Sequence, residues 1–260
     1  MTLSFKFGTV GSPAGTPSRP GGTVGGIQYS ASLGLDALEL AWVHGVRISA
    51  SACEASKRAA EETGLALSVH APYFINLNGE EEKWPRLRQY LIDAAHFGNL
   101  AGATDIIFHP GTYFGKPADE VLKVILPRLQ DCMDEIRADG NLVTLRPEIS
   151  GKAAMLGSLA DVLAMARSIP GVVPCMDFAH LHARLGQWAD HVRKPDPRSG
   201  CVEIQGVMDG IERGTKQLKA AEQSKLVQEI EFQPHHLDGA VWSQRVNEVP
   251  LSAGFSSTNC

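Results

Sequence analysis

Imidazole and carboxylate side chains recur where short apolar runs of this 260-residue sequence end. The residues concerned are His70, His109, Glu148, Asp177 and His180. Histidine nitrogens and carboxylate oxygens form a ligand set that zinc, manganese and iron accept without thiolates. A single histidine after a strand is more often an ordinary loop or core residue, so the hypothesis depends on the whole set. If the strand ends meet, these residues predict a site for several metal ions.

The other histidines are less informative. His182 lies two residues after His180 and is either an additional ligand or a residue that supports the ligands. The pair His235–His236 belongs to a segment that the pattern does not place, and we expect solvated loop residues there. The same expectation covers His96 and His191.

A repeating pattern of elements must bring the ligand candidates together. Apolar runs that we interpret as strands cover residues 3–7, 37–43, 66–69, 105–108, 142–145 and 172–176. Longer segments with helical spacing lie between them, notably 84–102 and 118–140. The glycine- and proline-rich stretch 8–26 is expected to be a loop, either flexible or shaped over a site. Strict alternation implies a parallel sheet, either doubly wound or closed into a barrel.

Helix boundaries carry local signals. Ser51 with Glu54 has the spacing of a capping box that opens a helix, and Gly64 would close that helix. Ser158 with Asp161 predicts a second helix start.

The absence of nucleotide-binding motifs favours the barrel. No G-x-G-x-x-G follows the first strand, so the dinucleotide fingerprint is missing. Residues 111–117 are one residue too short for a P-loop, and Pro117 replaces the Ser or Thr that would hold magnesium. We therefore expect an α/β fold of the TIM (β/α)8 type, formed by residues 1–260 as a single barrel domain. Residues 1–184 accommodate six βα units, and 185–260 would form an atypical region in which the last one or two units are incomplete.

Composition and charge exclude several classes of protein. With 43% hydrophobic and 20% charged residues, the chain is neither disordered nor fibrous. No apolar run reaches the roughly 18 residues that crossing a bilayer requires, and the first residues lack a signal-peptide pattern. We expect a cytoplasmic monomer without a membrane partner. Five dispersed cysteines argue against disulfides, and a net charge of -5 provides no general attraction to polyanions.

Four stretches of the sequence together resemble a known family. They are VHAPYFINL at 69–77, FHPG at 108–111, RPE at 146–148 followed by GSL at 157–159, and DFAH at 177–180. The sequence resembles the endonuclease IV-like barrels, or AP endonuclease family 2, which are relatives of the xylose isomerase-like superfamily. The resemblance extends over about residues 5–184. The first two stretches are specific in combination, whereas either alone is a modest signal.

This resemblance implies a zinc-dependent endodeoxyribonuclease of base-excision repair, which cleaves double-stranded DNA on the 5′ side of abasic sites. His70, His109, Glu148, Asp177 and His180 match the family's ligand positions for up to three zinc ions, with manganese as an alternative. Glu148 would bridge two ions and be the catalytic carboxylate, Asp177 would bind one of these two ions, and His180 would serve the third. Clustered zinc would activate a water molecule, so no side-chain nucleophile would be needed.

The loop after the third strand is implied to contact the substrate. Tyr73 matches a residue that enters the DNA at the lesion, and Asn76 lies in the same loop. The alternative for Tyr73 is simple packing over the mouth of the barrel.

The sequence departs from the family after residue 184. Thr215 and Gln217 stand where the family has an acidic residue and a histidine, and no segment after Glu231 reads as an apolar strand ending in glutamate. Either the chain has diverged or its reading frame has changed near the end. We expect an incomplete site and weak or absent activity, unless the tail supplies ligands of its own. The candidates are Glu203, Glu229, Glu231, His235 and His236.

Two other functions remain open. A sugar isomerase or epimerase could use the same barrel, with a metal that polarises a hydroxy-carbonyl substrate. Histidines after both the third and the fourth strand favour the nuclease, because isomerase sites of this superfamily rely more on carboxylates. The third hypothesis is a non-catalytic barrel that binds a metal or nucleic acid.

Overall fold

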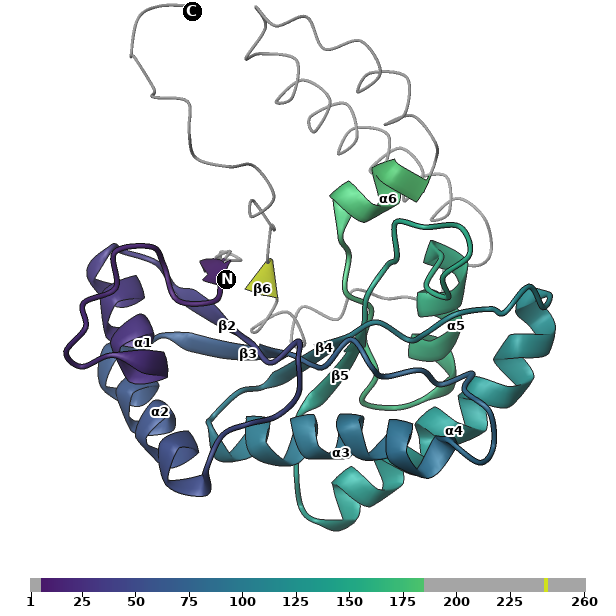
Figure 1. The fold of residues 1–260 in the computed structure, drawn as a ribbon, viewed down its shortest axis with the longest axis horizontal. Coiled ribbons are helices and arrows are strands. Elements are labelled where there is room, and N and C mark those ends of the chain that lie inside the picture. Colours follow the sequence, from purple (N-terminus) through teal and green to yellow (C-terminus); the bar gives the residue numbers. More distant parts are fainter. Residues whose placement is uncertain (1–5, 185–240, 243–260) are drawn as a thin grey trace, which may run out of the picture.

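Strands and helices alternate along the chain in the computed structural model, which describes residues 6–184 and 241–242 (Figure 1). The elements are β1 Lys6–Val10, α1 Gly22–Ser32, β2 Ala37–Ala41, α2 Ala50–Thr63, β3 Ala66–His70, α3 Trp84–Leu100, β4 Asp105–Phe108, α4 Ala118–Ala138, β5 Thr144–Pro147, α5 Leu159–Ser168, α6 Phe178–Arg184 and β6 Val241–Trp242. Helices α1 to α5 follow one another around one side of a curved sheet (Figure 1).

The sheet is parallel, as the alternation predicts. Its strand order is β5-β4-β3-β2-β1-β6. The segment 172–175 adds to β5 through parallel bridges from Leu145 to Val172 and from Glu148 to Cys175, so it takes the sixth strand position along the chain. Strand β6 pairs in parallel with β1, which is where the last strand of a closing barrel must lie. The described residues therefore confirm the α/β barrel type.

The two faces of the sheet differ in polarity. Leu38, Val69, Ile106 and similar residues point outward and pack against the helices in one buried cluster. Successive side chains on a strand point to opposite faces, so the neighbouring positions point inward. Buried polar residues occupy these inward positions, namely Glu39, Ser68, His70 and Asp105 on the strands and Glu148 after β5. The sheet thereby places its titratable groups inside the barrel.

The prediction of a loop over residues 8–26 is wrong at both ends, because β1 extends to Val10 and α1 begins at Gly22. The sequence pattern does not predict α1, because the glycines on its buried face add no apolar side chains. A Cβ on Gly25 would lie 1.9 Å from the carbonyl oxygen of Pro20, and one on Gly26 would lie 2.2 Å from Ser12 Oγ. These glycines allow the preceding loop to lie directly on α1.

The start of α2 also needs correction. Its N-cap is Ser49, whose hydroxyl accepts a hydrogen bond from the Ala52 amide at 3.2 Å, whereas Ser51 lies in the first turn. Gly64 ends the helix with φ 72°, as expected. The capping box of Ser158 and Asp161 at α5 is confirmed.

Other element boundaries differ by a few residues. Strand β5 begins at Thr144, two residues later than expected, and Leu142 is exposed. The run 172–176 contributes bridges rather than a full strand. Strand β6 was not expected, because two residues are too few for periodicity to show.

Two expectations from composition can be compared with the described residues. Cys53, Cys132 and Cys175 are free thiols, as expected, while Cys201 and Cys260 lie outside the described ranges. Across residues 6–184 and 241–242, no helix has the length and apolar character that a membrane span requires.

Candidate metal centre

Five titratable residues meet at the carboxyl ends of the strands. His70 is the last residue of β3, His109 follows β4, and Glu148 follows β5. Asp177 precedes α6, and His180 lies within this helix. Parallel strands present their carboxyl ends at one edge, so residues far apart in sequence become neighbours there.

The first group consists of His70, His109 and Glu148. Glu148 Oε2 lies 3.2 Å from Nε2 of His70 and 3.3 Å from Nε2 of His109. One ligand atom from each residue lies within 4.8 Å of the others. His70 and Glu148 are almost fully buried, at 1% and 3% exposure. Three donors at this spacing can surround a single cation.

The second group consists of Glu148, Asp177 and His180. Nδ1 of His180 lies 3.6 Å from Glu148 Oε1 and 3.3 Å from Asp177 Oδ2. The ligand atoms again lie within 4.8 Å of one another. Glu148 thus directs Oε2 to the first group and Oε1 to the second, so its two oxygens face different sets of donors.

Backbone contacts orient two of the imidazole rings. Nδ1 of His70 lies 3.0 Å from the carbonyl oxygen of Ala71, and Nδ1 of His180 lies 2.9 Å from that of Ile149. A carbonyl only accepts hydrogen bonds, so Nδ1 of each ring is the donor in these contacts. In His70 this leaves Nε2, the nitrogen that faces Glu148, for a cation, whereas in His180 Nδ1 faces both the carbonyl and the carboxylates of Glu148 and Asp177. Metal-binding histidines characteristically donate their second ring nitrogen as His70 does here. The donor set therefore fits a divalent cation.

Electrostatics around Glu148 favour positive charge. Burial alone would raise the pKa of Glu148, but the hydrogen bond with His70 and the charges of His109, His70 and His180 lower it to about 2. Burial raises the pKa of Asp177, and the nearby Glu148 adds to this effect while His180 opposes it. Two close carboxylates repel each other, and a shared cation relieves that repulsion.

Tyr73 lies over the histidines at the rim of the site. Its ring stacks on His109 with 5.6 Å between centroids and meets the edge of His70 at 5.4 Å. The residue is 43% exposed, so one side of the ring is accessible from solution. This position is compatible with both interpretations of Tyr73, namely packing over the mouth of the barrel and contact with a substrate.

Asn76 shapes the loop that carries Tyr73. Its Oδ1 accepts hydrogen bonds from the amides of Asn78 at 3.1 Å and Thr112 at 3.4 Å. A Cβ on Gly111 would lie only 2.1 Å from this oxygen, so glycine is required there. Substrate contact by Asn76 stays a prediction.

Several sequence predictions fall outside what the structure describes. This applies to the side chain of His182 and to residues His191, Glu203, Thr215, Gln217, Glu229, Glu231, His235 and His236. His96 is exposed on α3 beside Phe97, as expected of an ordinary surface histidine.

Sequence reasoning did not single out two residues that contact each other beside the second group. Tyr113 follows the FHPG stretch, and Arg184 ends α6. Arg184 Nη2 lies 3.3 Å from Tyr113 Oη. The spacing of four residues between His180 and Arg184 on one helix was the available signal.

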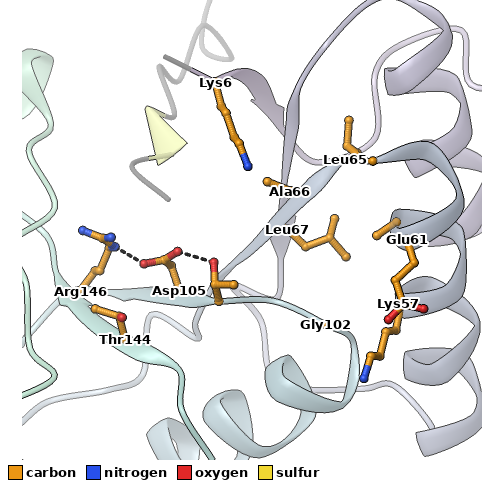
Figure 2. Close-up of a pocket in the computed structure, with 13 residues that line it drawn as sticks. Lys6, Lys57, Glu61, Leu65, Ala66, Leu67, Gly102, Asp105, Thr144 and Arg146 are labelled. Carbon is orange, nitrogen blue, oxygen red and sulfur yellow. Dashed lines mark hydrogen bonds and ion pairs between the residues drawn. The ribbon is translucent and has the colours of Figure 1, made fainter. Parts of the chain in front are cut away.

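A cavity of about 550 Å³ lies at the amino ends of the strands, away from the histidines. Ala66, the first residue of β3, lines it, whereas His70 is the last residue of that strand. Figure 2 shows Asp105 paired with Arg146 in its wall. Because TIM barrels place chemistry at the carboxyl ends, this cavity is not the candidate site.

Comparison with known proteins identifies relatives over most of the chain. A family model described as a xylose isomerase-like TIM barrel matches residues 27–218. An uncharacterised protein of Methanocaldococcus jannaschii is 31% identical over 70% of this chain and 64% of its own length. Endonuclease 4 of Thermus thermophilus is 26% identical over 74% of this chain and 66% of its own length. A probable endonuclease 4 of Shouchella clausii is 31% identical over 50% of this chain and 46% of its own length. The chain thus spans between about half and two thirds of these relatives.

Solved structures share the fold at lower identity. Endonuclease IV from Thermus thermophilus has a TM-score of 0.53 and 20% identity, covering 80% of this chain and 71% of its own. A D-psicose 3-epimerase has a TM-score of 0.56 and 16% identity, covering 73% of this chain and 69% of its own. Nuclease and epimerase both appear, so these likenesses describe the fold alone.

Proposed function

Because the chain belongs to the xylose isomerase-like TIM barrel family, we propose that it is a metal-dependent phosphodiesterase of the endonuclease IV type, which cleaves double-stranded DNA on the 5′ side of abasic sites. The observation that carries this proposal is the pair of ligand groups that share Glu148. Relatives named endonuclease 4 support it from sequence.

Each group has a definite place in the proposed centre. His70 and His109 with Glu148 would hold one ion, and Glu148 with Asp177 and His180 would hold a second. Bound divalent cations, with zinc as the expected metal, would supply Lewis-acid charge to a phosphodiester and lower the pKa of water. A third zinc ion would need ligands beyond those that the structure describes.

The protein's own side chains would keep this centre charged and oriented. Glu148 stays ionised because its pKa is lowered to about 2. The carbonyl groups of Ala71 and Ile149 fix the rings of His70 and His180. Tyr73, exposed at the rim, would enter the DNA at the lesion.

Two histidines in the first group favour a nuclease over a sugar epimerase. A group that holds its cation with neutral imidazoles keeps a more positive net charge than one that uses carboxylates. Such a site attracts an anionic phosphodiester more strongly than a neutral ketose. The rate should be low, because Thr215 and Gln217 replace a charged and an imidazole ligand of the family pattern.

Incision of an abasic-site duplex by the zinc-loaded protein tests the proposal. We expect slow cleavage on the 5′ side, a loss of cleavage in Glu148→Gln, and a smaller loss in His182→Ala. Glu120→Gln, on the exposed first turn of α4, is the control and should cleave as wild type does.

Other outcomes of these assays would contradict the ranking of the two residues, the substrate class or the metal dependence. Equal losses in Glu148→Gln and His182→Ala would show that the two residues are ranked wrongly. Turnover of a ketohexose without incision of DNA would identify an epimerase instead. Zinc-independent incision, or none at all, would overturn the proposed nuclease.

A further inference from the structure

Arg184, the last residue of α6, ties this helix to the loop between β5 and α5. Its Nη1 donates to the carbonyl oxygens of Ser150, Lys152 and Met155 at 3.0, 2.9 and 3.0 Å. Its Nη2 lies 3.5 Å from the carbonyl oxygen of Ala153. One guanidinium thus gathers several carbonyls of a single loop.

The same guanidinium reaches a second loop through Tyr113. Its Nη2 donates to Tyr113 Oη at 3.3 Å, and its central carbon lies 6.0 Å from the ring centroid. Tyr113 in turn donates to Oδ2 of Asp161, which also accepts from the Ser158 amide at 2.8 Å. Burial, together with the bond to Asp161, raises the pKa of Tyr113, so the hydroxyl keeps the proton that it donates.

The loop held by Arg184 begins beside Glu148 and touches His180. The carbonyl oxygen of Ile149 lies 2.9 Å from Nδ1 of His180. A Cβ on Gly151 would lie 3.2 Å from Cδ2 of the same ring. His180 and Arg184 are four residues apart and share a face of α6. The position of His180 relative to Glu148 therefore depends on how α6 sits on this loop.

We propose that Arg184 is a positioning residue for the second group, Glu148, Asp177 and His180, and that it sets the affinity of this group for a divalent cation. Arg184 contacts the loop and Tyr113 rather than the cation. The inference rests on the proposed metal centre. The first group draws His70 and His109 from the ends of β3 and β4, so Arg184 should affect it less, through the shared Glu148 and the contact of His109 with the His180 ring, whose centroids lie 5.7 Å apart.

Arginine suits this task better than lysine. A guanidinium offers five N–H donors in a rigid plane, whereas a lysine ammonium is a compact charge with three donors on a flexible stem. Arg184→Lys should therefore keep the positive charge but only part of the hydrogen bonding.

Cobalt titration of the full chain, stripped of metal by a chelator, tests the inference. The visible absorption of Co²⁺ reports the coordination of each class of site, independently of activity. Wild type should show two classes, one for each group. Arg184→Ala should weaken one class by about tenfold or more, as the loss of a supporting contact does at metal sites, and weaken the other by a clearly smaller factor. Arg184→Lys should fall in between, and Arg167→Ala, on the exposed side of α5, should match wild type.

The outcomes separate the two proposals. A wild-type chain that binds no Co²⁺ would overturn the metal centre itself. Two classes in wild type with unchanged affinities in Arg184→Ala, or equal losses in both classes, would overturn the positioning role alone. If circular dichroism shows that Arg184→Ala does not fold, Tyr113→Phe decides, because it removes a single hydroxyl, the one that Arg184 contacts and that donates to Asp161. It should weaken the same class by a smaller factor, and an unchanged affinity would contradict the inference.

Discussion

Glu148 is the residue on which the candidate site depends. Its two carboxylate oxygens face different partners, the Nε2 atoms of His70 and His109 on one side and His180 on the other. All of these partners could be identified from sequence, because each follows an apolar run and the ends of parallel strands converge. What sequence could not provide is the bracing by Arg184, whose partners are backbone carbonyls of a loop about thirty residues earlier in the chain.

At the same scale, Tyr73 provides a test of substrate contact. If its exposed face stacks on a base, Tyr73→Ala should weaken binding of an abasic-site duplex by about 1 to 3 kcal/mol. The zinc content of Tyr73→Ala should stay that of wild type, because the Tyr73 ring contacts the histidines but belongs to neither ligand group. Fluorescence anisotropy gives the affinity, with Tyr73→Phe as the control that keeps the ring. Wild-type affinity in Tyr73→Ala would mean that the residue only packs over the mouth.

At the scale of elements, the ends of helices could be predicted where particular side chains mark them. The capping box of α5 and the glycine that ends α2 were visible in sequence, since capping depends on a few adjacent residues. Helix α1 could not be predicted, because its buried face contains glycines, which allow close contact with a loop but add no apolar side chain to the pattern.

The N-cap of α2 can be assigned by two substitutions. Ser49→Ala removes the oxygen that accepts the Ala52 amide and should lower the free energy of unfolding by about 1 kcal/mol. Ser51→Ala, in the first turn, removes an exposed hydroxyl that lies 3.1 Å from Ser49 Oγ but leaves the capping oxygen in place, and it should change the free energy of unfolding by less than about 0.5 kcal/mol. Urea denaturation gives both values. The reverse order would restore Ser51 as the cap.

Close packing of α1 on its preceding loop can be tested at Gly26. A methyl group there would overlap Ser12, with Oγ at 2.2 Å and Cβ at 2.8 Å. Gly26→Ala should therefore destabilise the chain by about 1 to 3 kcal/mol, despite the better helix propensity of alanine. Adding Ser12→Gly should recover part of the loss. Thermal unfolding of the single and double variants measures this, and a stabilised Gly26→Ala would contradict the packing.

At the scale of the whole molecule, the alternation of strands and helices was enough to predict a parallel barrel, because chirality and connection rules leave few other arrangements. The pairing of β6 with β1 could not be predicted, since it joins the two ends of the chain through a two-residue strand. The candidate centre links β3, β4, β5 and α6, so it connects elements from much of the described fold.

This placement predicts that metal stabilises the entire barrel. A cation that binds only the folded chain raises the free energy of unfolding by about 2.7 kcal/mol at a hundredfold excess over its dissociation constant. Zinc should raise the melting temperature of wild type, and EDTA should lower it. Glu148→Gln should respond much less to either addition. Differential scanning calorimetry measures the shifts, and equal responses of the two proteins would place the stabilising ion elsewhere.

Zinc content, measured by mass spectrometry on folded protein, tests directly whether Glu148 serves both ligand groups. Wild type should carry about two zinc ions per chain or more, because two groups of three ligands are present. His70→Ala should lose about one ion, since His70 belongs only to the first group, and Glu148→Gln should lose about two. A Glu148→Gln protein that keeps the zinc content of wild type would contradict the shared centre.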